Sequence, residues 1–248
     1  MQEELGIIIQ NILIAKDTYQ MDITTMNPIE MLPGQFFNIQ VEGHLLRRPI
    51  SIASIDGQQK FTIIYKVVGE GTAVLSNMLP TSKINLFGPL GSSYPVHNEL
   101  DEVLLIGGGV GVPPLYEVAK QYRNLNKKVI AVLGFNDQAS VFYEDEFKAL
   151  GVEVHLACMD GSYGVKGTVI DAIEAAKITC DFVYSCGPMP MLKAVENRYT
   201  KGYTSFESRM ACGMGACMAC VCKDKEDKQI YYRICKDGPV FPIGKVGL

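Results

Sequence analysis

A set of cysteines near the end of the chain limits most strongly how this sequence can fold. Cys212, Cys217 and Cys220 give the spacing C-x4-C-x2-C, and Cys235 follows after a charged insert. This is the plant-type spacing for a [2Fe–2S] cluster, which needs four converging thiolates. The glycines and alanines between the cysteines permit unusual backbone angles and keep bulky side chains out of a tight loop. The sequence therefore predicts a [2Fe–2S] cluster held by these four cysteines.

Two other uses of the cysteines stay open. Four cysteines can hold structural zinc, although such sites usually show two short C-x2-C knuckles and this chain has one. A disulfide is a weaker alternative, because the first residues, Met1 to Glu4, are acidic where a signal peptide would be basic. Cys222 is a fifth candidate ligand, but choosing it over Cys220 gives C-x4-C-x4-C, which fits less well.

Composition narrows the class of protein. The 248 residues allow two or three small domains, and the net charge of −4 gives no electrostatic reason to expect nucleic acid or an anionic membrane as partner. The longest apolar run, near 103–115, is glycine-rich and too short to span a bilayer. Eight cysteines in a chain of this length indicate metal or redox work rather than a disulfide scaffold. We expect a cytoplasmic protein with neither a nucleic-acid nor a membrane partner.

The chain divides into three parts. Residues 1–98 contain short β-branched runs separated by turn signals, which favour a small antiparallel barrel; the runs are Ile7–Ile14, Gln35–Val41, Ile50–Ile55, Phe61–Val68 and Ile84–Phe87. Residues 99–204 alternate strand and helix patterns, which favour a Rossmann-like parallel sheet with helices on both faces; the strands are Val103–Ile106, Val129–Gly134, Val152–Ala157 and Asp181–Ser185. Residues 205–248 form a small domain around the cysteines.

Two loops in the first part are suited to a flavin nucleotide. In Arg48-Pro49-Ile50-Ser51, Pro49 biases Arg48 toward an extended backbone, from which its planar guanidinium can reach a diphosphate. Ser51, on the emerging strand, can hydrogen-bond a flavin ring. The segment Gly69-Glu70-Gly71-Thr72 follows about twenty residues later and offers backbone donors and a hydroxyl. The alternative is an exposed basic turn and a glycine hairpin.

A glycine-rich loop, Gly107 to Gly111, follows a strand and opens a helix, as a pyrophosphate site requires. The pattern Gly109-x-Gly111-x-x-Pro114 has proline at the third glycine position, where a first helical turn tolerates it. No acidic residue lies at the usual distance for gripping a ribose, and Asp137 comes later, so the loop does not separate NAD from NADP. A glycine-rich turn that serves packing alone is the alternative.

A second candidate for the nucleotide site is Cys186-Gly187, which follows the fourth predicted strand. The carboxyl end of a parallel strand faces the ligand crevice, so Cys186 can lie beside a nicotinamide. The alternative is a small buried thiol with no role in binding.

With these motifs in view, the chain resembles the ferredoxin–NADP reductase superfamily. Its tail, Glu207 to Cys217 with Cys235 to Phe241, resembles more narrowly the electron-transfer subunits of the NAD-linked (class 1B) dihydroorotate dehydrogenases. The resemblance implies that Cys212, Cys217, Cys220 and Cys235 hold the cluster and implies an FAD site lined by Arg48, Pro49, Ile50, Ser51, Tyr65, Lys66, Val67, Gly71 and Thr72.

The resemblance also implies a function. Electrons from a separate, FMN-containing dihydroorotate dehydrogenase catalytic subunit would pass through the [2Fe–2S] cluster and FAD to NAD⁺ as co-substrate, in the synthesis of UMP, within a heterotetramer of two copies of each chain. The three parts account for the 248 residues and leave no room for a (β/α)₈ barrel, so oxidation of dihydroorotate is expected in a separate chain. No general base is expected in this chain. Two alternatives remain: a subunit of a bifurcating transhydrogenase or sulfhydrogenase, and a zinc-stapled, non-enzymatic nucleotide-binding protein.

Overall fold

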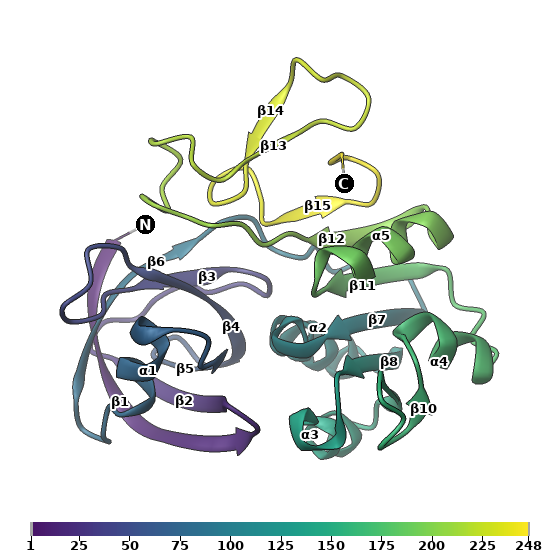
Figure 1. The fold of residues 1–248 in the computed structure, drawn as a ribbon, viewed down its shortest axis with the longest axis horizontal. Coiled ribbons are helices and arrows are strands. Elements are labelled where there is room, and N and C mark those ends of the chain that lie inside the picture. The colour runs from purple at the N-terminus through teal and green to yellow at the C-terminus, as the bar shows by residue number, and fades with distance from the viewer. Residues whose placement is uncertain (1, 248) are drawn as a thin grey trace.

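A computed structural model describes residues 2–247. Figure 1 shows a barrel formed by the first third of the chain, an α/β layer structure formed by the middle, and the C-terminal segment lying across both. The barrel and the α/β part lie side by side and make a direct interface. The C-terminal segment therefore has the other two parts as its support.

The first part is a closed six-stranded antiparallel barrel with strand order β1-β2-β5-β4-β3-β6. The predicted barrel is confirmed, with one strand that the sequence analysis missed, β2. In β2, apolar residues such as Met21 and Ile23 alternate with polar ones and fill the barrel interior, so the strand contains no apolar run. The strands, with one helix between the last two, are β1 (Gln2–Ala15), β2 (Thr18–Thr25), β3 (Phe36–Ile39), β4 (Arg48–Asp56), β5 (Lys60–Lys66), α1 (Glu70–Ser76) and β6 (Lys83–Leu90).

The second part is a parallel sheet in the order β10-β9-β8-β7-β11-β12, covered by helices. All four predicted strands are present, and β10 and β12 are additional. The strands are β7 (Glu102–Gly108), β8 (Lys128–Phe135), β9 (Glu153–Cys158), β10 (Val165–Lys166), β11 (Phe182–Cys186) and β12 (Lys201–Ser205). The helices are α2 (Pro113–Asn124), α3 (Glu144–Ala149), α4 (Val169–Ala175) and α5 (Met189–Arg198), with 3₁₀ turns η1 (Gly109–Gly111) and η2 (Gln138–Ser140).

The C-terminal segment is joined to both other parts. Its strands β13 (Val221–Lys223) and β14 (Tyr231–Arg233) form a hairpin, whereas β15 (Val240–Pro242) pairs antiparallel with β12 as a seventh strand of the large sheet. An apolar cluster fastens the segment to the barrel and to α5; it contains Phe36, Leu90, Leu192, Phe206, Cys220, Ile234, Cys235, Phe241 and Val246. The cysteine-bearing segment thus shares its core with its neighbours.

A buried polar contact fixes the barrel against the α/β part. The carboxylate of Glu117, on α2, accepts a hydrogen bond from the backbone N–H of Ile55 at 2.8 Å. Lys120, one turn along α2, donates to Glu117 at 2.9 Å and to the carbonyl of Ile55 at 2.7 Å. Because the Glu117 side chain is almost fully buried, its charge is acceptable only with these donors in place. The two parts therefore meet in a defined register.

Within residues 2–247, none of the helices has the length and apolar character that a membrane crossing requires.

A glycine in β12 provides a test of this packing. Gly202 has φ +121°, and a Cβ atom there would lie 1.9 Å from the carbonyl oxygen of Val183 on β11. We expect Gly202→Ala to lower the free energy of unfolding by about 2–5 kcal/mol, because backbone strain and overpacking add. Gly57→Ala is the control: its φ is +68° but nothing lies within 4 Å, so we expect about 1–2 kcal/mol. Denaturant titration followed by far-UV circular dichroism measures both, and equal losses would contradict the described β11–β12 contact.

Candidate functional site

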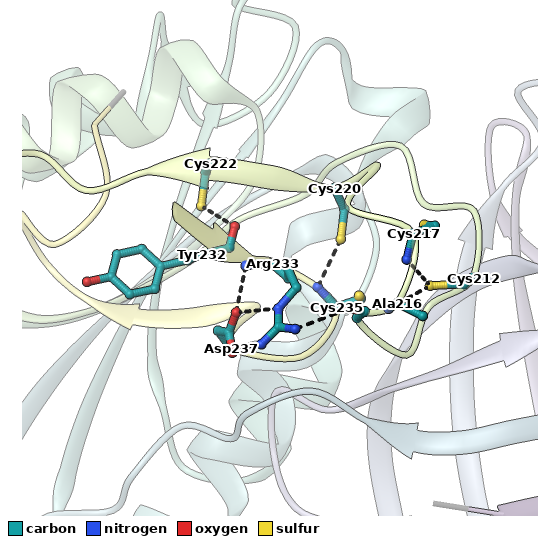
Figure 2. A network of polar contacts seen from close by, with 10 residues as sticks. Cys212, Ala216, Cys217, Cys220, Cys222, Tyr232, Arg233, Cys235 and Asp237 are labelled. Carbon is teal, nitrogen blue, oxygen red and sulfur yellow. Dashed lines mark hydrogen bonds and ion pairs between the residues drawn. The ribbon is translucent and has the colours of Figure 1, made fainter. Parts of the chain in front are cut away.

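The four predicted cluster ligands lie in one region, as Figure 2 shows, and they form two pairs. The Sγ of Cys212 accepts hydrogen bonds from the backbone N–H groups of Ala216 at 3.3 Å and Cys217 at 3.4 Å. The Sγ of Cys220 accepts one from the backbone N–H of Cys235 at 3.4 Å. Across residues 2–247 there is no group of three Cys, His, Asp or Glu side chains placed to bind one metal ion. Two pairs of thiols match the need of a two-iron cluster, with one pair for each iron.

The thiols differ in acidity. For Cys212, slight burial disfavours the thiolate, but the backbone N–H groups of Met214, Cys217 and Ala216 outweigh it and lower its pKa to about 6. Burial, with Cys220 close by, raises the pKa of Cys235 to about 12. Iron binds the thiolate form, so bound metal ions must supply the charge that keeps Cys235 deprotonated. Backbone donors that face thiolate sulfur fit an iron–sulfur cluster.

The loop between the first two cysteines owes its shape to left-handed glycines. Gly213 and Gly215 have φ values of +71° and +82°. A Cβ atom at Gly215 would lie 2.7 Å from the side chain of Lys236, which follows the fourth cysteine. The loop and the returning segment therefore pack together without space for larger residues.

An ion pair holds the returning segment in place. The guanidinium of Arg233 binds the Asp237 carboxylate at 2.9 and 3.1 Å, and the Arg233 backbone N–H donates to the same carboxylate at 2.8 Å. A third guanidinium nitrogen donates to the carbonyl of Gly215 at 3.1 Å. This cation lowers the pKa of Asp237. Because Arg233 bridges both segments, it fixes the position of Cys235 relative to the loop.

Exposure differs across the thiol set. Cys220 and Cys235 are buried, whereas Cys217 is exposed and is flanked by the exposed side chains of Met214 and Met218. The thiol of Cys222, the fifth candidate, donates to the carbonyl of Tyr232 at 3.5 Å (Figure 2). Burial raises the pKa of Cys222 to about 11. Cys222 thus lies apart from the two thiol pairs.

The two predicted flavin loops come together at the barrel surface. A Cβ atom at Gly71 would lie 2.4 Å from Nε of Arg48, so the guanidinium rests directly on this glycine. The hydroxyl of Thr72 accepts hydrogen bonds from the N–H groups of Val68 at 3.0 Å and Gly69 at 3.3 Å, and so shapes the loop itself. The loop leaves room for the guanidinium only because residue 71 has no side chain.

The remaining predicted flavin residues differ in direction. Ile50 and Tyr65 point into the barrel core, where the Tyr65 hydroxyl donates to Asn11 at 2.9 Å. Pro49 and Ser51 alternate with Ile50 and so occupy the outer face of β4. Val67 follows β5 and donates its backbone N–H to the carbonyl of Asp17 at 2.7 Å. Because its side chain is in the barrel core, Tyr65 can offer only backbone atoms to a ligand outside the barrel.

A cavity of about 650 Å³ lies at the carboxyl ends of the parallel strands. Three of the four predicted nucleotide residues line it, namely Gly109, Gly111 and Gly187, and Lys66 lines it from the barrel side. A Cβ atom at Gly111 would lie 2.4 Å from the carbonyl oxygen of Cys186, so the two predicted loops are in backbone contact. The fourth residue, Cys186, is 2% exposed and does not line the cavity; burial and the nearby Glu207 raise the pKa of its thiol.

Several residues that were not predicted also line this cavity, and two of them come from outside residues 99–204. Thr18 reaches it from β2, and Glu207 reaches it from the segment that follows β12. Glu207 is accessible to water through the cavity but is otherwise surrounded by protein, and this desolvation raises its pKa. A signal existed for Glu207, since it follows a parallel strand, but that strand was not recognised.

The comparisons with known proteins agree with this arrangement. Residues 207–247 match a family model described as the iron–sulfur cluster binding domain of dihydroorotate dehydrogenase B, and residues 105–197 match an oxidoreductase NAD-binding domain. The chain is similar to the electron transfer subunit of dihydroorotate dehydrogenase B (NAD(+)) from Fusobacterium nucleatum, at 50% identity over 94% of this chain and 93% of that protein. The corresponding subunit from Lysinibacillus sphaericus is 45% identical over 100% and 99%.

Among solved structures, the chain is similar to an NADH-dependent reduced ferredoxin–NADP oxidoreductase studied for flavin-based electron bifurcation, with a TM-score of 0.87 and 30% identity over 97% of this chain and 89% of that one. Fold and site together define an oxidoreductase chain of the ferredoxin–NADP reductase type that carries an iron–sulfur domain. Within that class, the chain belongs to the family of dihydroorotate dehydrogenase B (NAD(+)) electron transfer subunits. The family confirms the predicted fold class and the predicted cofactors, FAD and [2Fe–2S] with NAD as co-substrate.

The Arg233 ion pair gives a prediction for the thiol site. We expect Arg233→Lys to speed the loss of iron to a chelator severalfold, because lysine cannot bind Asp237 with two nitrogens and also reach Gly215. The readout is the decay of visible absorbance in the presence of the chelator. Arg198→Lys is the matched control, since Arg198 makes one exposed ion pair, to Glu174 at 2.8 Å, and lies over the ring of its neighbour Tyr199. Equal decay rates in both variants would show that the ion pair does not hold the site.

Proposed function

We propose that this chain carries electrons from a dihydroorotate-oxidising catalytic subunit to NAD⁺. The observation that carries this proposal is the order of sites along the molecule. The cysteine segment packs on β3 of the barrel, β3 pairs with the R-P-x-S strand β4, and the glycine-lined cavity is bordered from the barrel by Thr18 and Lys66. In this proposal residues 1–98 bind FAD, residues 99–204 bind NAD, and residues 205–248 bind the cluster.

When bound, FAD exchanges a hydride with NAD and single electrons with an iron–sulfur cluster. The chain's part is to bind and orient. Arg48, placed against Gly71, supplies a planar cation for the diphosphate, while Pro49 and Ser51 present the outer face of β4 to the ring. Ile50, Tyr65, Val67 and Thr72 shape this surface through the backbone and the barrel core.

The cavity is the proposed NAD site. Gly109, Gly111 and Gly187 let a nucleotide approach the backbone at the carboxyl ends of β7 and β11, where strand order reverses. Cys186 contributes to this site through its backbone, because its carbonyl packs against Gly111 and so holds the glycine loop in place. Lys66, predicted as a flavin residue, lies at the border of the two proposed sites, where its cation favours an anionic ligand in the flavin site or in the cavity.

The exposed thiol edge is the proposed contact with the catalytic subunit. Cys217 and the apolar side chains of Met214 and Met218 are exposed together, as a docking face for an electron donor requires. We further propose that the partner contains FMN, that two copies of each chain assemble, and that the complex works in the cytoplasm in the synthesis of UMP.

The alternatives have less support. A bifurcating transhydrogenase subunit shares this fold, but the similarity to such a structure is 30% identity against 50% for the family named above. A zinc-stapled protein without turnover would need one ion with converging ligands, whereas the thiols are paired.

Reconstitution tests the function. The anaerobically purified chain, mixed with a dihydroorotate dehydrogenase B catalytic subunit, is expected to form NADH when dihydroorotate is added. Cys217→Ser should keep the flavin spectrum, lose the cluster spectrum and lose most NADH formation, whereas Cys222→Ser should retain all three. An iron-free wild-type chain, or one that forms no NADH with any such partner, would refute the proposal.

A glycine pair tests the flavin site. We expect Gly71→Ala to weaken FAD binding about tenfold or more, because the new methyl group displaces the Arg48 guanidinium. Gly69→Ala, two residues earlier with nothing within 4 Å, should bind FAD as the wild type does. The measurement is FAD release followed by fluorescence. Equal affinities in both variants would place the diphosphate elsewhere.

A further inference from the structure

The side-chain amide of Asn38 stands out among the buried polar groups of the barrel. Asn38 lies on β3 and is 1% exposed. Neither its Nδ2 nor its Oδ1 has a hydrogen-bond partner. Burying such an amide without partners costs free energy, so a group in this state indicates a hydrogen-bond acceptor or donor that is supplied by a ligand.

The amide is directed at the cluster loop. A Cβ atom at Gly213 would lie 2.3 Å from Nδ2 of Asn38, so the amide packs directly on the glycine that follows Cys212. Gly213 is itself buried under the loop. No larger residue fits at position 213 while Asn38 keeps this rotamer, which makes the contact specific to the pair.

The strand register places Asn38 between the two proposed cofactor sites. Phe37 and Ile39 point into the barrel core, so Asn38 and Phe36 point outward, and Phe36 is part of the core of the cysteine segment. Asn38 pairs with Pro49 on the neighbouring strand β4. Side chains opposite each other on one face of a sheet lie about 4.5–5.5 Å apart at Cβ. Asn38 thus contacts the cluster loop and neighbours the R-P-x-S strand.

We propose that Asn38 is a positioning residue of the electron relay. Its amide donates a hydrogen bond to a sulfur atom on the Cys212 side of the cluster. This inference rests on the proposed function, because it assumes the cluster. Sulfur there carries negative charge and accepts from N–H donors, as Cys212 already does from Ala216 and Cys217. A donor of this kind stabilises the reduced cluster and raises its potential.

The first test compares variants in the full chain loaded with FAD and cluster. Asn38→Leu removes the donor while keeping the same branching of heavy atoms, and Asn38→Asp replaces the amide with a carboxyl of nearly the same shape. We expect Asn38→Leu to change the equilibrium constant for electron transfer from the cluster to the flavin about tenfold in favour of the flavin. This corresponds to a cluster potential that is lower by about 59 mV for one electron. Asn38→Asp should shift it less than Asn38→Leu does, because a carboxyl buried beside anionic sulfur takes up a proton and can still donate a hydrogen bond. An EPR-monitored redox titration measures the shift.

Asn85→Leu is the matched control. Asn85 lies on the adjacent strand β6, and its amide bonds instead to Arg47 at 2.6 Å and Glu3 at 2.9 Å. Its cluster potential should equal that of the wild type. Potentials in both Asn38 variants that match the control would overturn the proposal, as would a shift confined to the flavin potential.

A second measurement needs no variant that could fail to fold or to load. Residues 205–248 contain no asparagine, so in protein labelled with ¹⁵N-asparagine the cluster loop itself contributes no label. Pulsed EPR of the reduced cluster should show a ¹⁵N coupling in the wild type. A wild-type chain with the [2Fe–2S] signal but without this coupling refutes the role of Asn38 alone. A chain without that signal refutes the proposed function.

Discussion

The apolar cluster beneath the cysteine segment is the constraint on which the other features depend. Phe36 from the barrel, Leu192 from α5, and Phe206 and Phe241 from the C-terminal segment are all buried in it. Burial of side chains of this size contributes about 1.5–3 kcal/mol each. Because the cluster includes Cys220 and Cys235, the same contacts that attach the segment also fix two thiols. The positions of the thiols relative to the barrel are therefore set by packing rather than by a flexible tether.

Packing does not stabilise the negative charge of the thiolates. Backbone N–H groups stabilise part of that charge. N–H groups from the loop favour the ionised form of Cys212, whereas Cys235 is buried and keeps its proton in the absence of metal. The site is thus only partly prepared for iron. Metal binding must provide the remaining electrostatic stabilisation, which couples the order of the segment to its metal content.

Local patterns in the sequence predicted much of this structure. Apolar runs located five of the six barrel strands and four strands of the large sheet, and glycine loops located the cavity. Features that depend on distant pairing could not be found in this way. β15 joins the sheet beside β12 because Phe241 and Val240 complete two cores that each draw on three parts of the chain, which no local sequence pattern can indicate. Glu207 was missed for the same reason, since its place at the cavity follows from β12.

Polar side chains in and around the barrel differ in whether they have hydrogen-bond partners within the protein. Asn11 donates to three backbone carbonyls, and Glu117 accepts from Ile55 and Lys120, so both serve stability without a ligand. Asn38 is more deeply buried than either residue, at 1% exposed, and neither polar atom of its side chain has a partner. An unpartnered amide that is this deeply buried and faces the thiol loop is a cost that folding alone does not explain. Selection for the bound state explains it, because only there does the amide gain an acceptor.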